Sequence, residues 1–235
     1  MGGIFQSDES GVEIVKKIIS GGIYLVLDPS INKPELLEKL EQVLNGGVDI
    51  IQIWNHWPES VTQSVKVELI EEILDLTKEY NVPVLMNNDW KLLKTTRLDG
   101  VHFDEIPGDF DQIQDEIQHE FITGVTCSNN LEVIKWAEDH DFDYISFCSM
   151  FPSKSVDSCE IVRPKTVRKA REITDIPLFV SGGITPNNLS ELEDLDFQGV
   201  AVISGIMSSD LPKEAIHKYK QKLKEKFPLE GGKND

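Results

Sequence analysis

Eight short apolar runs recur along the chain, and they constrain its fold more than any other feature. They lie at residues 24–27, 49–53, 82–86, 100–103, 121–125, 144–147, 177–180 and 199–203. Most are continuously apolar rather than alternating, which is the pattern of parallel strands covered on both faces. Eight such strands joined by helices predict a (β/α)8 TIM barrel. An open doubly wound sheet is the alternative, because a repeat count from one sequence is easily wrong by one unit.

The segments between these runs have the apolar spacing of amphipathic helices. We expect helices over residues 34–44, 65–79, 129–139 and 212–224, and a further helix that begins at 185–188. Asn129 or Asn130 is the expected N-cap of the helix over 129–139.

A chain of 235 residues has the usual length of one α/β barrel, and no internal linker divides it. We therefore predict a single domain with three parts. These are an N-terminal extension over 1–21 with a helix at 8–20, the barrel over 22–226, and a flexible, polar tail over 227–235.

The charge balance narrows the class of ligand. The chain has 23 basic and 41 acidic residues and a net charge of -18. This argues against nucleic-acid binding and against anionic membranes. An anionic substrate would need local positive potential from backbone amides, helix N-termini or a divalent metal.

Cysteine spacing and hydropathy bear on location. Cys127, Cys148 and Cys159 form no CxxC pair, so neither a disulfide framework nor a zinc cluster is indicated. The first 20 residues hold no apolar signal core, and no apolar run is long enough to span a bilayer. We expect a cytoplasmic protein.

Two glycine- and serine-bearing segments follow the last two predicted strands, at 181–184 and 203–205. Glycines let backbone N–H groups approach an anion, and phosphate sites of such barrels are frequently built from these two loops. We expect a phosphate site there, although the glycines could serve only to make tight turns. Ser153, Lys154 and Ser155, after the sixth strand, could close over a phosphate or belong to a solvated loop.

Two further strand ends carry polar or aromatic residues. Asn87, Asn88 and Asp89 suit a hard cation such as Mg²⁺, with a second carboxylate from among Asp104, Glu105 and Asp109. The alternatives are that Asp89 caps the next helix and that the other carboxylates belong to an acidic surface.

After the second strand, Gln52 could hydrogen-bond a heterocycle, and Trp54 or Trp57 could stack on it. Buried indoles more often belong to the core. His56 and His102 could titrate near neutrality, but the sequence indicates no partner for either.

Taken in order, nine motifs resemble the thiamine phosphate synthase and thiazole tautomerase family. They are YLVLD (24–28), GVDIIQ (47–52), PVLMNND (83–89), DGVH (99–102), GVT (124–126), DYI (143–145), MFPS (150–153), SGGI (181–184) and VAVIS (200–204). With the closing helix they cover about residues 22–226, nearly the whole expected barrel.

The resemblance implies a transferase that joins a pyrimidine diphosphate to a thiazole phosphate and releases diphosphate with Mg²⁺, and a possible homodimer. Gln52, Asn88 and Thr126 match contacts to the pyrimidine diphosphate, and Asp89 matches a magnesium ligand. The remaining matches are to the thiazole phosphate site, namely Ser153, Ser155, Gly182, Gly183, Ile203 and Ser204.

The chain departs from the family pattern where the diphosphate is bound. Trp54 and His56 stand where the family has arginine and lysine, Val156 replaces a lysine, and Pro107 replaces the second magnesium carboxylate. Lys154, a protonated His56 and Glu105 are the residues that could compensate. The tautomerase histidine is replaced as well, by Ser128.

Three functions follow from these observations. The first is a divergent thiamine phosphate synthase. The second is a non-catalytic paralogue that binds thiazole phosphate or thiamine phosphate, which the missing cations favour. The third is an isomerase of a phosphorylated heterocycle, with His102 as its base.

Overall fold

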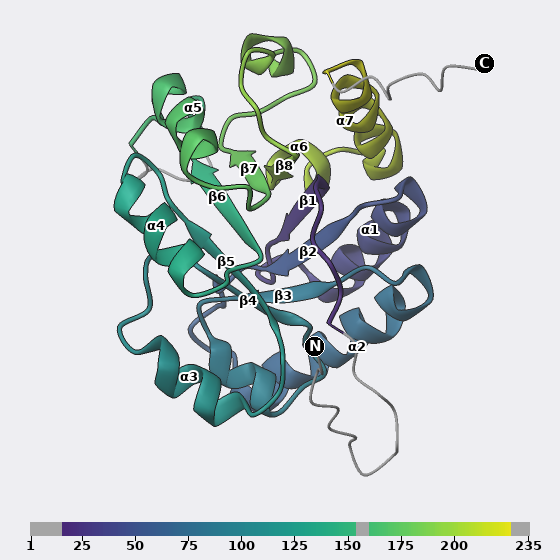
Figure 1. The fold of residues 1–235 in the computed structure, drawn as a ribbon. Coiled ribbons are helices and arrows are strands. Elements are labelled where there is room, and N and C mark those ends of the chain that lie inside the picture. The colour runs from purple at the N-terminus through teal and green to yellow at the C-terminus, as the bar shows by residue number, and fades with distance from the viewer. Residues whose placement is uncertain (1–15, 154–159, 227–235) are drawn as a thin grey trace, which may run out of the picture.

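The computed structural model describes residues 16–153 and 160–226, and within them eight parallel strands close into a barrel in chain order (Figure 1). Gly22 of the first strand pairs with Gly199 of the last, which closes the sheet. This confirms the (β/α)8 barrel, and the open sheet was wrong. The strands are β1 (Gly22–Leu27), β2 (Ile50–Ile53), β3 (Val84–Asn87), β4 (Gly100–Phe103), β5 (Ile122–Thr126), β6 (Tyr144–Cys148), β7 (Leu178–Ser181) and β8 (Gly199–Val202).

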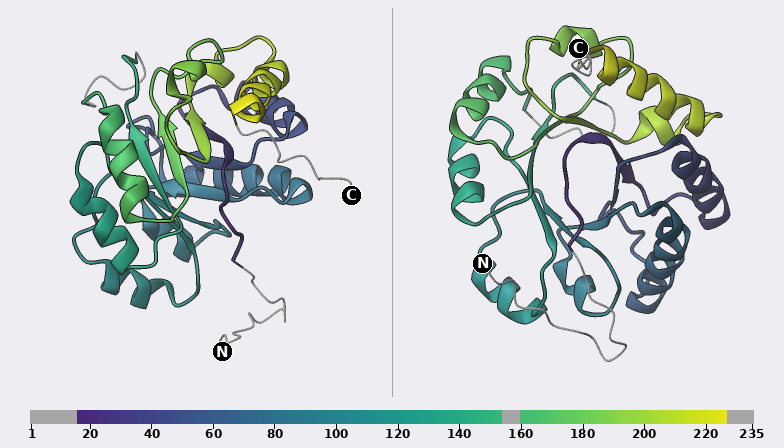
Figure 2. Two further views of the ribbon diagram at one scale, coloured as in Figure 1. Left: turned by 45° about the horizontal axis from the view of Figure 1, so that its top comes forward. Right: turned by 45° about the vertical axis from the view of Figure 1, so that its right-hand side comes forward.

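Helices surround the barrel, as the right-hand view of Figure 2 shows. The α-helices are α1 (Lys33–Gly46), α2 (Gln63–Thr77), α3 (Phe110–Ile117), α4 (Leu131–Asp139), α5 (Pro164–Ile173), α6 (Ser204–Met207) and α7 (Pro212–Lys226). Short 3-10 helices are η1 (Lys78–Tyr80), η2 (Trp90–Lys94) and η3 (Leu189–Leu192).

Two local expectations about helices are now decided. Asn130 is the N-cap of α4, because its side chain accepts a hydrogen bond from the backbone N–H of Glu132. The helix expected to begin at 185–188 is only the single turn η3, and just before it the side chain of Asn188 accepts a hydrogen bond from the N–H of Thr185.

Apolar side chains form two cores. The larger lies between the strands and the helices, and the smaller fills the barrel interior. Glycine shapes the interior at Gly124, where a Cβ would lie 2.0 Å from the ring of Tyr144. The glycine on β5 therefore makes room for the tyrosine ring of β6. The interior residues are Ile19, Tyr24, Ile50, Leu85, Ile122, Tyr144, Phe179 and Ala201.

The segment before β1 differs from the expected helix. Residues 16–20 are not helical, and Gly21 and Gly22 have φ values of 139° and 100°, which end any helical path. Residues 8–15 of that expected helix, and the tail over 227–235, lie outside the described residues.

Residues 16–20 close the lower end of the barrel. The Lys17 ammonium is 2.9 Å from Asp99, just before β4, and the Lys16 ammonium is 2.9 Å from Asp143, just before β6. Ile19 is only 6% exposed and joins the interior core. The opposite end of the barrel, where the strands have their C-termini, is the end available to a ligand.

Candidate functional site

The barrel brings the predicted site residues to one mouth, because the C-terminal ends of its parallel strands meet there. Each predicted residue lies near the end of its strand or just beyond it. They are Gln52 on β2, Asn88 and Asp89 after β3, Glu105 after β4, Thr126 at the end of β5, Ser153 after β6, Gly182 and Gly183 after β7, and Ile203 and Ser204 after β8. Lys154 and Ser155 lie outside the described residues.

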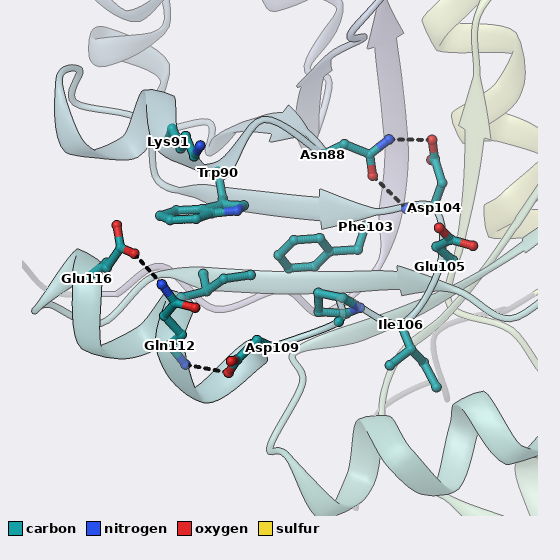
Figure 3. A pocket seen from close by; sticks show the side chains of 13 residues that line it. Asn88, Trp90, Lys91, Phe103, Asp104, Glu105, Ile106, Asp109, Gln112 and Glu116 are labelled. Atoms are coloured by element: carbon teal, nitrogen blue, oxygen red, sulfur yellow. Dashed lines mark hydrogen bonds between the residues drawn. The ribbon is translucent and has the colours of Figure 1, made fainter.

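Asp104 organises the β3–β4 side of the mouth. Its Oδ1 accepts a hydrogen bond from Asn87 Nδ2 at 2.9 Å, and its Oδ2 accepts one from Asn88 Nδ2 at 2.7 Å. Its backbone N–H donates to Asn88 Oδ1 at 2.9 Å. Figure 3 shows the side chains of Asn88 and Asp104 facing each other. The sequence offered Asp104 as a metal carboxylate or as part of an acidic surface, whereas the structure uses it to orient two amides.

The other acidic candidates have different environments. Glu105 is exposed and lines a cavity of about 650 Å³ beside Asp104. Asp109 is the N-cap of α3 and accepts from the N–H of Gln112, so its role is structural. Asp89 stands at the N-cap position of η2, as the capping alternative expected, but its side chain makes no capping hydrogen bond.

The described side chains at the mouth offer a magnesium ion only a small number of carboxylate oxygens. Among residues 16–153 and 160–226, no group of three or more His, Cys, Asp or Glu side chains could hold a metal ion. Mg²⁺ commonly binds through one or two carboxylates together with waters and substrate phosphates. Asp89 and Glu105 stay the predicted metal ligands, and binding in that mode would leave the other oxygen atoms to the ligand and to water.

The end of β2 places an aromatic pair at the mouth. The rings of Trp54 and His56 are 4.6 Å apart between centroids and tilted by 33°. His56 Nδ1 lies 3.2 Å from a carboxylate oxygen of Asp28, so His56 has the partner that the sequence did not indicate. Trp57 differs from Trp54, because it packs against the outer core.

A chain of hydrogen bonds crosses the barrel interior below the mouth. The Tyr24 hydroxyl donates to Gln52 Oε1 and lies 2.8 Å from the Tyr144 hydroxyl. His102 Nδ1 is 2.9 Å from the Tyr144 hydroxyl, and His102 Nε2 is 2.9 Å from Thr126 Oγ1. The chain thus joins two predicted ligand contacts, Gln52 and Thr126.

Burial keeps this chain uncharged. It raises the pKa of Tyr24 and of Tyr144 well above the usual value, and it lowers the pKa of His102 to about 4. The nearby negative charge of Asp104 acts in the opposite direction on His102, but desolvation is the larger effect. Sequence reasoning missed both tyrosines, although each begins a mainly apolar strand run with a hydroxyl group, which was the available signal.

The β6 and β7 loops pack directly on each other. The backbone N–H groups of Met150 and Phe151 donate to the carbonyls of Ser181 and Gly182, at 2.8 and 3.1 Å. Gly182 has a φ of 82°, and a Cβ there would lie 1.8 Å from Ser149 Oγ. Only glycine fits such a position. The tight-turn alternative and the phosphate-site expectation both accommodate this observation.

Comparison with known proteins decides the family. A family model described as thiamine monophosphate synthase matches residues 23–206. The chain belongs to that family. It is 34% identical over 193 residues to a thiamine-phosphate synthase of Staphylococcus carnosus, which covers 80% of this chain and 88% of that protein. It is 31% identical over 209 residues to a thiamine-phosphate synthase of a Hydrogenobaculum species, with 88% and 96% covered.

Among solved structures, the chain is similar to a thiamine phosphate pyrophosphorylase from Pyrococcus furiosus. The TM-score is 0.74 at 23% identity, and 87% of this chain and 96% of that chain are covered. At that identity the match supports the fold alone. In the described part of the chain, no helix is both long and apolar enough to cross a membrane.

Proposed function

We propose that the chain is a thiamine-phosphate synthase that joins a hydroxymethylpyrimidine diphosphate to a thiazole phosphate and releases diphosphate. One observation carries the proposal. Gln52, Asn88 and Thr126, which match family contacts to the pyrimidine diphosphate, share one barrel mouth with the glycine loops after β7 and β8. Relatives of about 30% identity over most of the chain support the same reaction.

The residues divide into two groups by the part of the substrate that each would bind. Gln52 would hydrogen-bond the pyrimidine, with Trp54 stacked on the ring, while Asn88 and Thr126 bind the diphosphate. The thiazole phosphate would lie against the loops after β6, β7 and β8, held by Ser153, Ser155, Gly182, Gly183, Ile203 and Ser204.

The reaction would break the bond between the pyrimidine methylene carbon and the diphosphate oxygen, and the thiazole nitrogen would form the new C–N bond. The protein would stabilise the charge on the leaving diphosphate and hold the nucleophile in line. Asp89 and Glu105 would hold Mg²⁺, which supplies positive charge to the diphosphate. Asp104 would keep Asn88 oriented toward it.

A second function is favoured by the β2 end of the mouth. Trp54 and His56 occupy the positions where the family has arginine and lysine, and His56 lies beside the Asp28 carboxylate rather than being free to face an anion. Loss of one donor to a developing charge costs about 3 kcal/mol, or roughly a hundredfold in rate. A paralogue that binds thiazole phosphate or thiamine phosphate without catalysis is therefore the alternative.

The isomerase hypothesis is weaker in this geometry. Both ring nitrogens of His102 are within hydrogen-bond distance of hydroxyl groups, and burial lowers its pKa to about 4. Such an imidazole is a poor general base at neutral pH. A cytoplasmic location and a homodimer stay predictions.

Turnover and binding separate the two functions. The purified full-length chain is given both substrates with Mg²⁺, and thiamine phosphate is measured by mass spectrometry, while calorimetry measures binding of the thiazole phosphate alone. Product formation supports the synthase. Binding without product at any Mg²⁺ concentration overturns the synthase and supports the paralogue, and absence of both overturns both proposals.

A further inference from the structure

In the hydrogen-bond chain inside the barrel, every group donates its proton toward the same end. We propose that Tyr24, Tyr144 and His102 are positioning residues that couple the amide orientation of Gln52 to the hydroxyl orientation of Thr126, so that an aminopyrimidine and a diphosphate bind cooperatively. The proposal deepens the proposed function, since it rests on Gln52 and Thr126 meeting those two parts of one substrate.

The direction follows from counting protons. The Tyr24 hydroxyl has one proton, and it is donated to Gln52 Oε1. The Tyr144 hydroxyl, 2.8 Å away, must then donate to Tyr24. With its own proton used, Tyr144 must accept from His102, which places the imidazole proton on Nδ1.

The same count of protons fixes which group donates at the Thr126 end of the hydrogen-bond chain. Because His102 is neutral, its Nε2 carries no proton and accepts from the Thr126 hydroxyl at 2.9 Å. In this state Thr126 has no proton left for an anion. The amide N–H₂ of Gln52 is directed away from Tyr24 and is the group that a ligand ring would meet.

An anion at Thr126 requires the opposite direction. A phosphate oxygen only accepts, so Thr126 must donate to it and must itself accept from His102 Nε2–H. Tyr144 then donates to His102 Nδ1, Tyr24 donates to Tyr144, and the Gln52 amide rotates so that its N–H₂ donates to Tyr24.

The rotated amide changes what the mouth recognises. Gln52 Oε1 is now presented to the ligand, and it accepts from an amino group on a ring. A diphosphate at one end of the chain thus favours a ring with an amino donor at the other end. A ring that presents an oxo group at the same place loses this advantage.

Burial forces all hydrogen bonds of this series to point the same way. Tyr24 and Tyr144 are 1% and 0% exposed, and His102 is 5% exposed. An unsatisfied buried polar group costs about 1–3 kcal/mol, so a chain with a mismatch in its middle is disfavoured relative to either direction. The two ends therefore reverse together.

The first test reads the His102 tautomer in the wild-type protein by ¹⁵N NMR, with the signal assigned by its loss in His102→Asn. We expect the Nδ1–H form in the free protein and the Nε2–H form with saturating inorganic diphosphate and Mg²⁺. An unchanged tautomer in the diphosphate-bound protein overturns the proposal, and so does failure of diphosphate to bind.

The second test measures cooperativity by calorimetry. Inorganic diphosphate should bind at least about fivefold more tightly when 4-amino-5-hydroxymethyl-2-methylpyrimidine is saturating, within the usual range of coupling between sites. The 4-oxo analogue should give no enhancement. Equal effects of the two pyrimidines contradict the model.

Variants separate coupling from a structural role. Tyr144→Phe and Tyr24→Phe cut the chain at different links, and each folded variant should bind both ligands without mutual enhancement. Tyr219→Phe is the matched control. The buried Tyr219 hydroxyl donates to the Ile184 carbonyl and takes no part in the series of hydrogen bonds from Gln52 to Thr126, so this variant should keep the enhancement. Enhancement retained in both cut variants overturns the proposal.

These results are distinguishable from failure of the proposed function. A protein that makes no thiamine phosphate but shows the tautomer change and the cooperativity keeps this inference and loses the synthase. A protein that turns over substrates without either response keeps the synthase and loses this inference.

Discussion

Asn88 and Asp104 bind each other through both ends of the Asn88 amide: Nδ2 donates to the Asp104 carboxylate, and Oδ1 accepts from the Asp104 N–H. The pair locks the β3 and β4 loops together at the mouth. Asn88 does so with a φ of 58°, a left-handed conformation that Asn tolerates better than most residues. The residue therefore shapes the backbone after β3 and also joins the two loops.

Replacement of Asn88 separates these two roles. Asn88→Ala and Asn88→Gly should both lower kcat/KM at least about tenfold, because each loses the proposed hydrogen bond from the Asn88 amide to the charged diphosphate. Asn88→Ala should also be about 1 kcal/mol less stable than Asn88→Gly, since alanine is strained at positive φ. Steady-state kinetics and urea unfolding measure the two effects. Equal stabilities of the two variants would contradict the strain argument.

Trp54 should report ligand binding by fluorescence. If a pyrimidine stacks on its indole, adding pyrimidine diphosphate should quench emission, and Trp54→Ala should remove that response. Trp57→Phe is the control, since Trp57 packs against the outer core and should contribute no ligand-dependent signal. An unchanged spectrum at saturating ligand would exclude stacking on Trp54.

Gly182 should not tolerate a side chain. Gly182→Ala combines a left-handed φ with a Cβ 1.8 Å from Ser149 Oγ, and we expect a loss of more than about 2 kcal/mol in the free energy of unfolding together with weaker thiazole phosphate binding. Gly108→Ala, where a Cβ would meet nothing within 4 Å, should leave both quantities unchanged. Thermal unfolding and calorimetry provide the comparison. Phosphate affinity that survives in a folded Gly182→Ala protein would place the phosphate elsewhere.

Variants of Ile19 and Ile18 provide a matched comparison that tests whether Ile19 closes the lower end of the barrel. Ile19 is 6% exposed and Ile18 is 90% exposed. Ile19→Ala should destabilise the protein by about 2 kcal/mol or more, because it leaves a cavity in the interior core, and Ile18→Ala should have little effect. Denaturant unfolding of both variants is the measurement. Similar losses in the two would show that Ile19 does not close the barrel.

His102 should make stability depend on pH between about 4 and 6.5. Its pKa is about 4 in the folded protein against about 6.5 in an unfolded chain, so the unfolded state binds more protons in this window. The stability that it contributes is complete above pH 6.5 and is lost as the pH falls toward 4. The magnitude is on the order of 3 kcal/mol.

His102→Gln tests that pH dependence, because glutamine has no titrating group. Wild type should lose more stability than the variant when both are taken from pH 7 to pH 4. Parallel pH profiles of the unfolding free energy would show that His102 is not buried in its neutral form.

Periodicity in the sequence predicted the eight strands of the barrel, but only the pairing of β1 with β8 excluded the open sheet. The apolar runs are nearly continuous because each strand is covered by helices on one side and by the interior core on the other. Placement of the predicted site residues at the mouth followed from strand direction alone, since the residues just after parallel strands meet at one end. The sequence also indicated that Gly182 and Gly183 have a special position after a strand. The structure gives the physical reason, because both have positive φ values and pack closely against the neighbouring loop.

Only the tertiary structure decided which polar groups meet inside and above the barrel. Tyr24 and Tyr144 are 120 positions apart, and nothing in either strand run indicates that their hydroxyls lie 2.8 Å from each other. The same is true of Asp104, which follows β4 and holds Asn87 and Asn88 at the end of the preceding strand, β3. Hydrogen-bond partners depend on barrel closure and strand register, which are properties of the whole sheet, whereas apolar periodicity is a local property that each segment carries in its own residues.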